Sequence, residues 1–239
     1  MINIKRVFIV LGLIIFFLPT TFAQKVNQFD KNNKRTGVWK KYYNNKRLRY
    51  VGKFVNGKEV GVFKYYDITT TSHPTIIKKF STTSDSASVK HYTLKGKLRS
   101  KGMMIGRNRV GKWIYYFSNG KLFSEENYVE GKLEGDVKNY FNNEKIAEHC
   151  EYKNGVKQGV SKKYSDQGIL IEEMNYAEGK ANGIAKYFNL KGDLKEEGSY
   201  KNGKRSGKWD FYIGGKKVSK KEAKKQAAFD KSKSGTPKN

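Results

Sequence analysis

The sequence is poor in the residues that build most catalytic and cross-linked sites. Its 239 residues include one cysteine, three histidines and three prolines. A single cysteine, Cys150, excludes an internal disulfide framework, and we expect a small buried apolar filler there in preference to a reactive thiol. His73, His91 and His149 are scattered, and none stands at metal-ligand spacing from another. HExxH, CxxC and Gly-x-Ser-x-Gly motifs are absent from the sequence. We therefore expect a protein that is not an enzyme, has no catalytic or metal site and uses no cofactor.

Acidic residues are scarce relative to basic ones. The chain has 49 lysines and arginines against 22 aspartates and glutamates, a net charge of +27. Such an excess favours polyanionic partners such as phospholipid headgroups, acidic polysaccharide or nucleic acid. The alternative is that lysine only maintains solubility and protects the edges of a sheet.

Long apolar runs are also rare, and the one present lies at the N-terminus. Lys5 and Arg6 precede the 12-residue run Val7–Leu18, and residues 21–23 resemble a small-x-small cleavage site. Residues 1–23 are therefore predicted to be a signal peptide cleaved near Ala23. An uncleaved anchor is the alternative, but a membrane span needs about 20 apolar residues. The mature protein is expected to be exported to the periplasm, outer envelope or extracellular space, which argues against nucleic acid as its partner.

What the sequence does have is a glycine-led repeat. Leading glycines stand 24 residues apart at Gly111, Gly135, Gly159, Gly183 and Gly207, and earlier units begin at Gly37, Gly61 and Ala87. Such a period indicates a repeat architecture in which each unit depends on its neighbours for burial. The predicted array spans residues 37–218, after a lead-in at 24–36. Residues 219–239 are predicted to be a basic, soluble tail, with two or three helical turns over residues 219–229 and disorder over residues 232–239.

Each unit has the pattern of a β-hairpin. A turn such as Asn119-Gly120 separates its two halves, and Asn-Gly is typical of a type I′ turn with positive φ at both residues. The prediction is an all-β fold, an elongated antiparallel meander of about eight hairpins in a single-layer twisted sheet on the order of 80 Å long. Counted from the leading glycine as position 0, three positions recur. Position 5 is aromatic in every unit, position 11 is aliphatic in seven (Leu48, Leu98, Leu122, Ile146, Leu170, Leu194 and Val218), and position 3 is lysine in six (Lys40, Lys64, Lys90, Lys138, Lys162 and Lys186).

The position of the turn predicts which residues lie opposite one another. If positions 8 and 9 form the turn, paired positions sum to 17, so position 6 lies opposite position 11. Trp39, Trp113 and Trp209 at position 2 then share one substantially buried face with the aliphatic position 11. The position 3 lysines lie on the other face, where they are candidate contacts for an anionic surface. Two of them pair as Lys162–Glu173 and Lys186–Glu197, whereas no glutamate repeats opposite Lys40, Lys64 and Lys90.

The aromatic residues at position 5 fall on the lysine side in this register. Tyr116 and Tyr140 are nevertheless candidate core aromatics of the repeat. Either a bulge turns them inward, or both faces carry aromatic rows, and the sequence leaves both arrangements open.

The link Tyr128–Gly135 and the hairpin sequence Gly111–Leu122 resemble the MORN repeat, and more closely its bacterial variant, as in YwqK-type antitoxins. The resemblance implies an extended antiparallel sheet used for protein contacts or, in some members, for phospholipid association. The unit from Gly61 departs from the pattern, because Ile68–Ser86 replaces the usual turn with a Thr/Ser-rich insertion. That insertion is either a local contact site or a tolerated surface loop.

Three functions are compatible with these features. The first is an exported, non-catalytic protein-interaction or scaffolding module with an unknown protein partner in the cell envelope. The second is peripheral binding to an anionic membrane surface through the lysine positions. The third is an antitoxin or immunity protein that blocks a partner. A small-molecule substrate is not expected.

Overall fold

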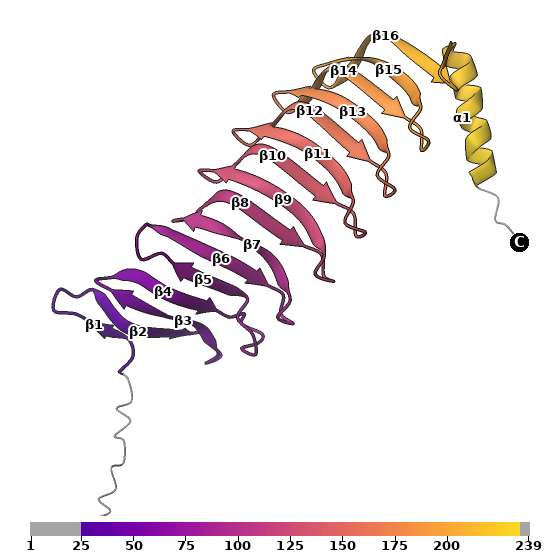
Figure 1. The fold of residues 1–239 in the computed structure, drawn as a ribbon. Coiled ribbons are helices and arrows are strands. Elements are labelled where there is room, and N and C mark those ends of the chain that lie inside the picture. The colour runs from indigo at the N-terminus through magenta and orange to yellow at the C-terminus, as the bar shows by residue number, and fades with distance from the viewer. Residues whose placement is uncertain (1–24, 235–239) are drawn as a thin grey trace, which may run out of the picture.

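The computed structural model describes residues 25–234, so the predicted signal peptide lies outside the described residues. The described chain forms one antiparallel sheet of 17 strands followed by one helix (Figure 1). Each strand pairs with the next strand along the chain, from β1–β2 to β16–β17. The sheet stays open and elongated, and its strands are arched (Figure 1). This confirms the predicted all-β meander of hairpins.

The strands follow the 24-residue period. They are β1 (Gln28–Phe29), β2 (Arg35–Tyr42), β3 (Leu48–Val55), β4 (Lys58–Tyr65), β5 (Ile76–Phe80), β6 (Ser86–Tyr92), β7 (Leu98–Ile105), β8 (Asn108–Tyr116), β9 (Leu122–Val129), β10 (Lys132–Tyr140), β11 (Ile146–Lys153), β12 (Val156–Tyr164), β13 (Leu170–Ala177), β14 (Lys180–Phe188), β15 (Leu194–Lys201), β16 (Lys204–Ile213) and β17 (Lys216–Val218). The helix is α1 (Lys220–Ser234).

Two kinds of turn alternate along the sheet, and the type I′ turns are not where the sequence predicted them. Most links between hairpins have positive φ at both central residues, as at Asn154 (53°) and Gly155 (83°), and are the type I′ turns, whereas the β7–β8 link has positive φ only at Gly106 (59°). Within the β8–β9 hairpin the turn lies near Asn119-Gly120 as predicted, but only Gly120 has positive φ. Its amide donates to the Phe117 carbonyl oxygen at 2.9 Å, which closes a three-residue loop. Such a loop needs one left-handed residue and not two.

The register follows the predicted sum of 17 up to Tyr115. Gly111 lies opposite Tyr128 and Trp113 opposite Glu126. The register then shifts between Tyr115 and Tyr116, so that position 5, and not position 6, lies opposite the aliphatic position 11. The three-residue loop is the cause of this correction.

The leading glycines form bulges. Gly135 has φ of 77°, and the pairing of β9 with β10 shifts between Leu133 and Val137 on either side of it. A side chain at positive φ is strained, which explains glycine at this position. The unit led by Ala87 supports this explanation, because the β5–β6 pairing runs through Ala87 without a shift.

The insertion at Ile68–Ser86 contains a strand. It holds all of β5, flanked by two longer loops at residues 66–75 and 81–85. The first loop is attached to the neighbouring hairpin, because Arg47 donates to the carbonyl oxygens of Ile68 and Thr69, and Asn45 Nδ2 donates to that of Ile68 at 3.2 Å. The usual second strand of the hairpin is therefore retained, and the extra residues lie in its turns.

One row of residues provides most of the core of this single-layer sheet. It crosses the strands on what we call the packed face, in the order Trp39, Gly52, Phe63, Lys78, Val89, Gly102, Trp113, Glu126, Val137, Cys150, Ser161, Met174, Ala185, Gly198 and Trp209. Trp113 and Phe63 are completely buried, and Cys150 is 2% exposed, which confirms the predicted buried filler. Trp39 and Trp209 are only half-buried, so the predicted burial is not uniform. The aliphatic position 11 is also half-buried, and it lies opposite position 5, as Leu122 lies opposite Tyr116. The prediction that position 11 shares a face with the tryptophans is therefore wrong, because the register shifts at the three-residue loop.

Residues in this packed row have complementary sizes. A Cβ atom built on Gly102 would lie 2.4 Å from the Trp113 ring, and Gly52 and Gly198 are equally close to Phe63 and Trp209. Where position 2 is small, the preceding neighbour is larger, as Met174 is beside Ala185. Each ring therefore lies directly over backbone, and the close contact replaces a second layer.

The C-terminal end of the sheet is followed by α1, whose start is fixed by a capping box. The Glu222 amide donates to Ser219 Oγ at 3.2 Å, and the Ser219 amide donates to Glu222 Oε2 at 2.8 Å. The Ser219-x-x-Glu222 spacing is a sequence signal for this helix start that the predicted tail did not use. The tail is thus helical over 15 residues and reaches Ser234, so the disorder predicted from Ser232 is wrong for residues 232–234, and residues 235–239 lie outside the described residues.

Candidate anionic-surface site

The face opposite the packed face, which we call the lysine face, carries one continuous cross-strand row. In order it consists of Lys40, Val51, Lys64, Ile77, Lys90, Lys101, Ile114, Glu125, Lys138, His149, Lys162, Glu173, Lys186, Glu197 and Asp210. All six candidate lysines belong to this lysine row. The composition of the row changes at Glu125. Before Glu125 the row contains lysines and aliphatic residues, and from Glu125 onward it contains lysines, acidic residues and one histidine.

The first half of the lysine row is uncompensated. Lys40, Lys64 and Lys90 are exposed, and their cross-strand neighbours include Val51 and Ile77. The one acidic residue in strands β2 to β7, Glu59, accepts from Tyr65 on the packed face. Within the part of the chain that the structure describes, ion pairs occur only from Lys112 onward.

The net charge follows the same division. Residues 25–110 contain 21 basic and 4 acidic residues, a net charge of +17. Residues 111–218 contain 19 basic and 16 acidic residues, a net charge of +3. The positive field of the sheet is therefore concentrated over β2 to β7.

The second half of the lysine row is a series of charge pairs. Lys162 Nζ lies 3.5 Å from Glu173 Oε2, which confirms one predicted pair, and Lys186 lies opposite Glu197 in the register. Lys112 Nζ lies 2.6 Å from Glu125, and its hydrogen bond holds the pKa of that carboxyl below its ordinary value. The lysines of this half are half-buried.

The aromatic residues at position 5 lie on the lysine face. The Tyr140 hydroxyl donates to Glu125 Oε2 at 3.0 Å, and the Tyr212 hydroxyl donates to Glu197 Oε1 at 2.7 Å. Burial and the Glu125 carboxylate raise the pKa of Tyr140 to about 12. The register shift at position 5 does not turn these rings to the packed face, so both faces carry aromatic residues. Tyr116 and Tyr140 are both half-buried.

A half-buried charge pair lies on the packed face of the second half. Lys157 Nζ lies 2.7 Å from Glu148 Oε1, and Ser161 Oγ donates to the same oxygen at 3.3 Å. Burial alone would raise the pKa of Glu148, but the hydrogen bond and charge of Lys157 outweigh it and leave the pKa below its ordinary value of 4.5.

This pair predicts a loss of stability in acid. Because the folded pKa of Glu148 is lowered, its contribution is present above the unfolded pKa and is lost as pH falls through the folded value. We expect Glu148→Gln to lower the free energy of unfolding at pH 7 by about 1–2 kcal/mol and to reduce its decline below pH 4.5. Urea unfolding from pH 3 to pH 7 measures both. Glu178→Gln, in an exposed turn, is the control, and an equal change in both variants would contradict the prediction.

An arginine stacks on each of the three tryptophan rings, and none of these arginines was among the predicted site residues. Arg35, Arg109 and Arg205 stand four residues before Trp39, Trp113 and Trp209, with guanidinium carbons 4.9, 4.9 and 3.9 Å from the ring centroids. The Arg-x-x-x-Trp spacing was the available signal. These arginines stack on the packed face, so they are occupied and do not belong to the candidate site.

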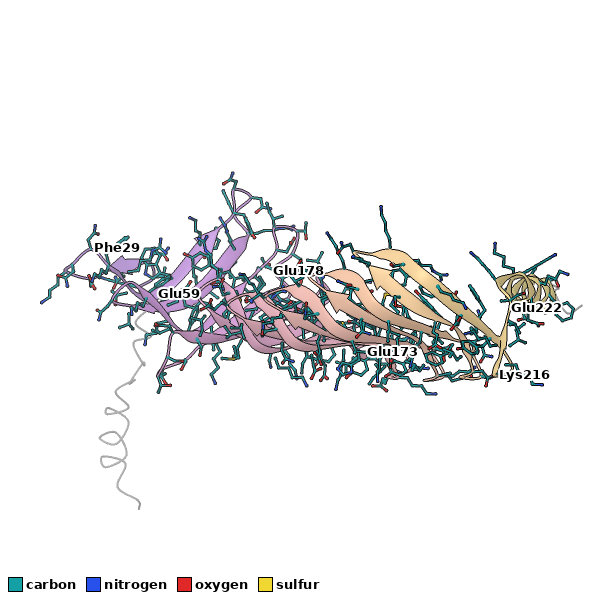
Figure 2. The ribbon with its side chains drawn as sticks, turned by 90° about the horizontal axis from the view of Figure 1, so that it is seen from above. Phe29, Glu59, Glu173, Glu178, Lys216 and Glu222 are labelled. Carbon is teal, nitrogen blue, oxygen red and sulfur yellow. The ribbon has the colours of Figure 1, made fainter. Side chains whose placement is uncertain are left out.

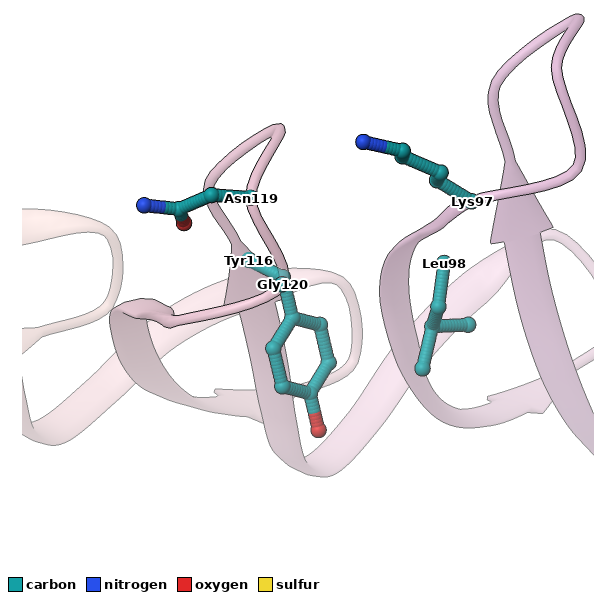
Figure 3. A pocket seen from close by; sticks show the side chains of 5 residues that line it. All are labelled: Lys97, Leu98, Tyr116, Asn119 and Gly120. Atoms are coloured by element: carbon teal, nitrogen blue, oxygen red, sulfur yellow. The ribbon is translucent and has the colours of Figure 1, made fainter.

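One pocket lies between two neighbouring hairpin turns. It is lined by Lys97, Leu98, Tyr116, Asn119 and Gly120 (Figure 3). Lys97 Nζ donates to the Ser118 carbonyl oxygen at 3.1 Å, so its charged group already links the two turns. Among residues 25–234 there is no group of three potential metal ligands, and no helix long and apolar enough to cross a membrane.

Comparison with known families supports the repeat assignment. The family model described as the MORN repeat variant matches residues 109–130, 133–154, 157–178 and 181–202. The four matches fall in the second half of the sheet and share its 24-residue step. No curated protein matches the chain.

Proposed function

Residues 109–202 of this chain are four tandem MORN repeat variants, and from this premise we propose an exported, non-catalytic scaffold of the cell envelope. Repeat sheets of this kind are typically binding proteins and not enzymes. In our proposal the scaffold attaches to an anionic membrane surface through the first half of its lysine face. The second half remains available to a protein partner.

The proposal of membrane attachment rests on the change in composition along the lysine row. Lys40, Lys64 and Lys90 are exposed, and they alternate with aliphatic residues and not with carboxylates. Lysines near an anionic bilayer contribute about 1 kcal/mol each. Aliphatic neighbours do not neutralise them, so their charges add.

A different observation favours protein contact in the second half. Val160 and Ile184 on its lysine face are 43% and 57% exposed, among charges that are already paired. Exposed aliphatic residues within a nearly neutral surface are suited to a protein interface. The antitoxin or immunity function stays a prediction of the family resemblance.

Vesicle co-sedimentation of the whole mature protein tests the membrane attachment. We expect binding to vesicles containing 30% phosphatidylglycerol at 50 mM salt, and at least tenfold weaker binding at 500 mM because salt screens exposed charges. Pure phosphatidylcholine vesicles are the control. Equal binding to both lipids, or binding that salt leaves unchanged, would refute attachment through the lysines.

A further inference from the structure

Uncompensated lysines occur at both ends of this elongated molecule. Besides the +17 of residues 25–110, helix α1 contains six lysines and two acidic residues. The helix lies at the C-terminal end of the sheet, far from β2 to β7 (Figure 1). Between them, residues 111–218 have a net charge of only +3. The described chain is therefore basic at both ends and nearly neutral in its middle.

One side of α1 faces the sheet. Glu222, Gln226 and Phe229 line a groove together with Ile213 and Val218. Residues on a helix are separated by about 100°, which places Lys220 and Lys224 on the side turned away from this groove. Lys221 lies within about 100° of Lys220, and all three lysines are exposed. Figure 2 views this end of the molecule from above, with Lys216 and Glu222 marking the junction of sheet and helix.

We infer that the lysine surface formed by Lys220, Lys221 and Lys224 is a second contact for an anionic membrane, and that the protein bridges two such surfaces. This inference rests on the proposed attachment through the first half of the lysine face. Eleven strand-to-strand steps of about 4.8 Å lie between β6, which contains Lys90, and β17, so the two basic ends are at least roughly 50 Å apart. That separation is far longer than a Debye length of about 8 Å, so the two basic ends act independently.

In this inference the two ends bind different surfaces because the middle of the molecule is nearly neutral. If the chain lay flat on one membrane, the lysine face of β9 to β16 would have to contact it as well. That stretch carries Glu125, Glu173 and Glu197, and its row ends at Asp210. These acids offset the lysines beside them, so contact by the middle of the sheet adds little to attachment by β2 to β7. The helix is then left available to a second surface.

Vesicle clustering tests the inference. Whole mature protein is mixed with vesicles containing 30% phosphatidylglycerol, and clustering is followed by turbidity while binding is measured separately by co-sedimentation. We expect the wild type to cluster vesicles. The variant Lys220→Gln/Lys221→Gln/Lys224→Gln is expected to bind within about threefold of wild type but to cluster at least tenfold more slowly.

A matched control removes the same charge from the middle of the chain. Lys180, Lys191 and Lys195 are also exposed, and their triple change to glutamine should leave clustering as in wild type. Glutamine at 220 and 221 removes positive charge from the helix start, where it opposes the macrodipole, so the change should not unfold α1; circular dichroism checks this.

The clustering and co-sedimentation results together distinguish failure of the second contact, of bridging and of the proposed function. Normal clustering by the helix variant, or equal slowing by the control, overturns the second contact. Wild-type binding without clustering overturns bridging while leaving the proposed function intact. Failure of the wild type to bind overturns the proposed function and the bridging together.

Discussion

Replacing Trp113 with alanine is expected to lower the free energy of unfolding by about 3–5 kcal/mol. The ring is completely buried, its Nε1 donates to the Met103 carbonyl oxygen at 2.9 Å, and Arg109 stacks on it. Equilibrium urea unfolding followed by circular dichroism measures the loss. Trp39→Ala is the matched control, because that ring is only half-buried and should cost less than half as much. Equal losses would show that burial in the packed row does not set stability.

A compensating change sharpens this test. Gly102→Met alone should also destabilise, because a Cβ atom there would lie 2.4 Å from the Trp113 ring. The double variant Gly102→Met/Trp113→Ala recreates the combination found at Met174 and Ala185. We expect it to be more stable than the sum of the single changes predicts by about 2 kcal/mol. Strict additivity would refute size complementarity as the organising rule of the row.

Replacing Lys40, Lys64 and Lys90 together by glutamine is expected to weaken binding to anionic vesicles about 100-fold. Three exposed lysines at about 1 kcal/mol each correspond to a loss of that size. Vesicle co-sedimentation at 50 mM salt measures it.

The chain contains its own control for this experiment. Lys138, Lys162 and Lys186 occupy the same repeat position and row, but acidic or histidine residues lie opposite them. Their triple change to glutamine removes the same charge and should weaken binding less than fivefold, because neighbouring carboxylates already offset these lysines. If both triple variants lost affinity equally, net charge and not the uncompensated half of the row would drive attachment.

Most of the fold could be predicted from the repeat. The 24-residue period, the position of the turn and the spacing of Trp113 from Glu126 depend only on neighbouring residues along the chain. For the same reason the pair Lys162–Glu173 could be predicted, since both residues belong to one hairpin. The type of turn was predicted wrongly because Asn-Gly suits both a type I′ turn and the end of a three-residue loop.

The candidate site could be predicted only in part. Its six lysines recur at one repeat position, so the sequence identifies them as a set. The sequence also indicates that the first three lysines have no glutamate opposite them. It did not show that one row passes through all six, because the row crosses bulges that shift the register between hairpins, as at Gly135.

The sequence by itself determined a hairpin repeat with lysines on one face, because alternation and turn residues act over a few positions. Only the tertiary structure decided which rings are buried and which lysines are uncompensated. Trp39, Trp113 and Trp209 occupy the same position in three repeats, yet only Trp113 is buried completely. Its burial depends on Gly102 in the preceding hairpin and on strands present on both sides, whereas Trp39 lies near the end of the sheet. Contacts between repeats, which no single repeat encodes, set these differences.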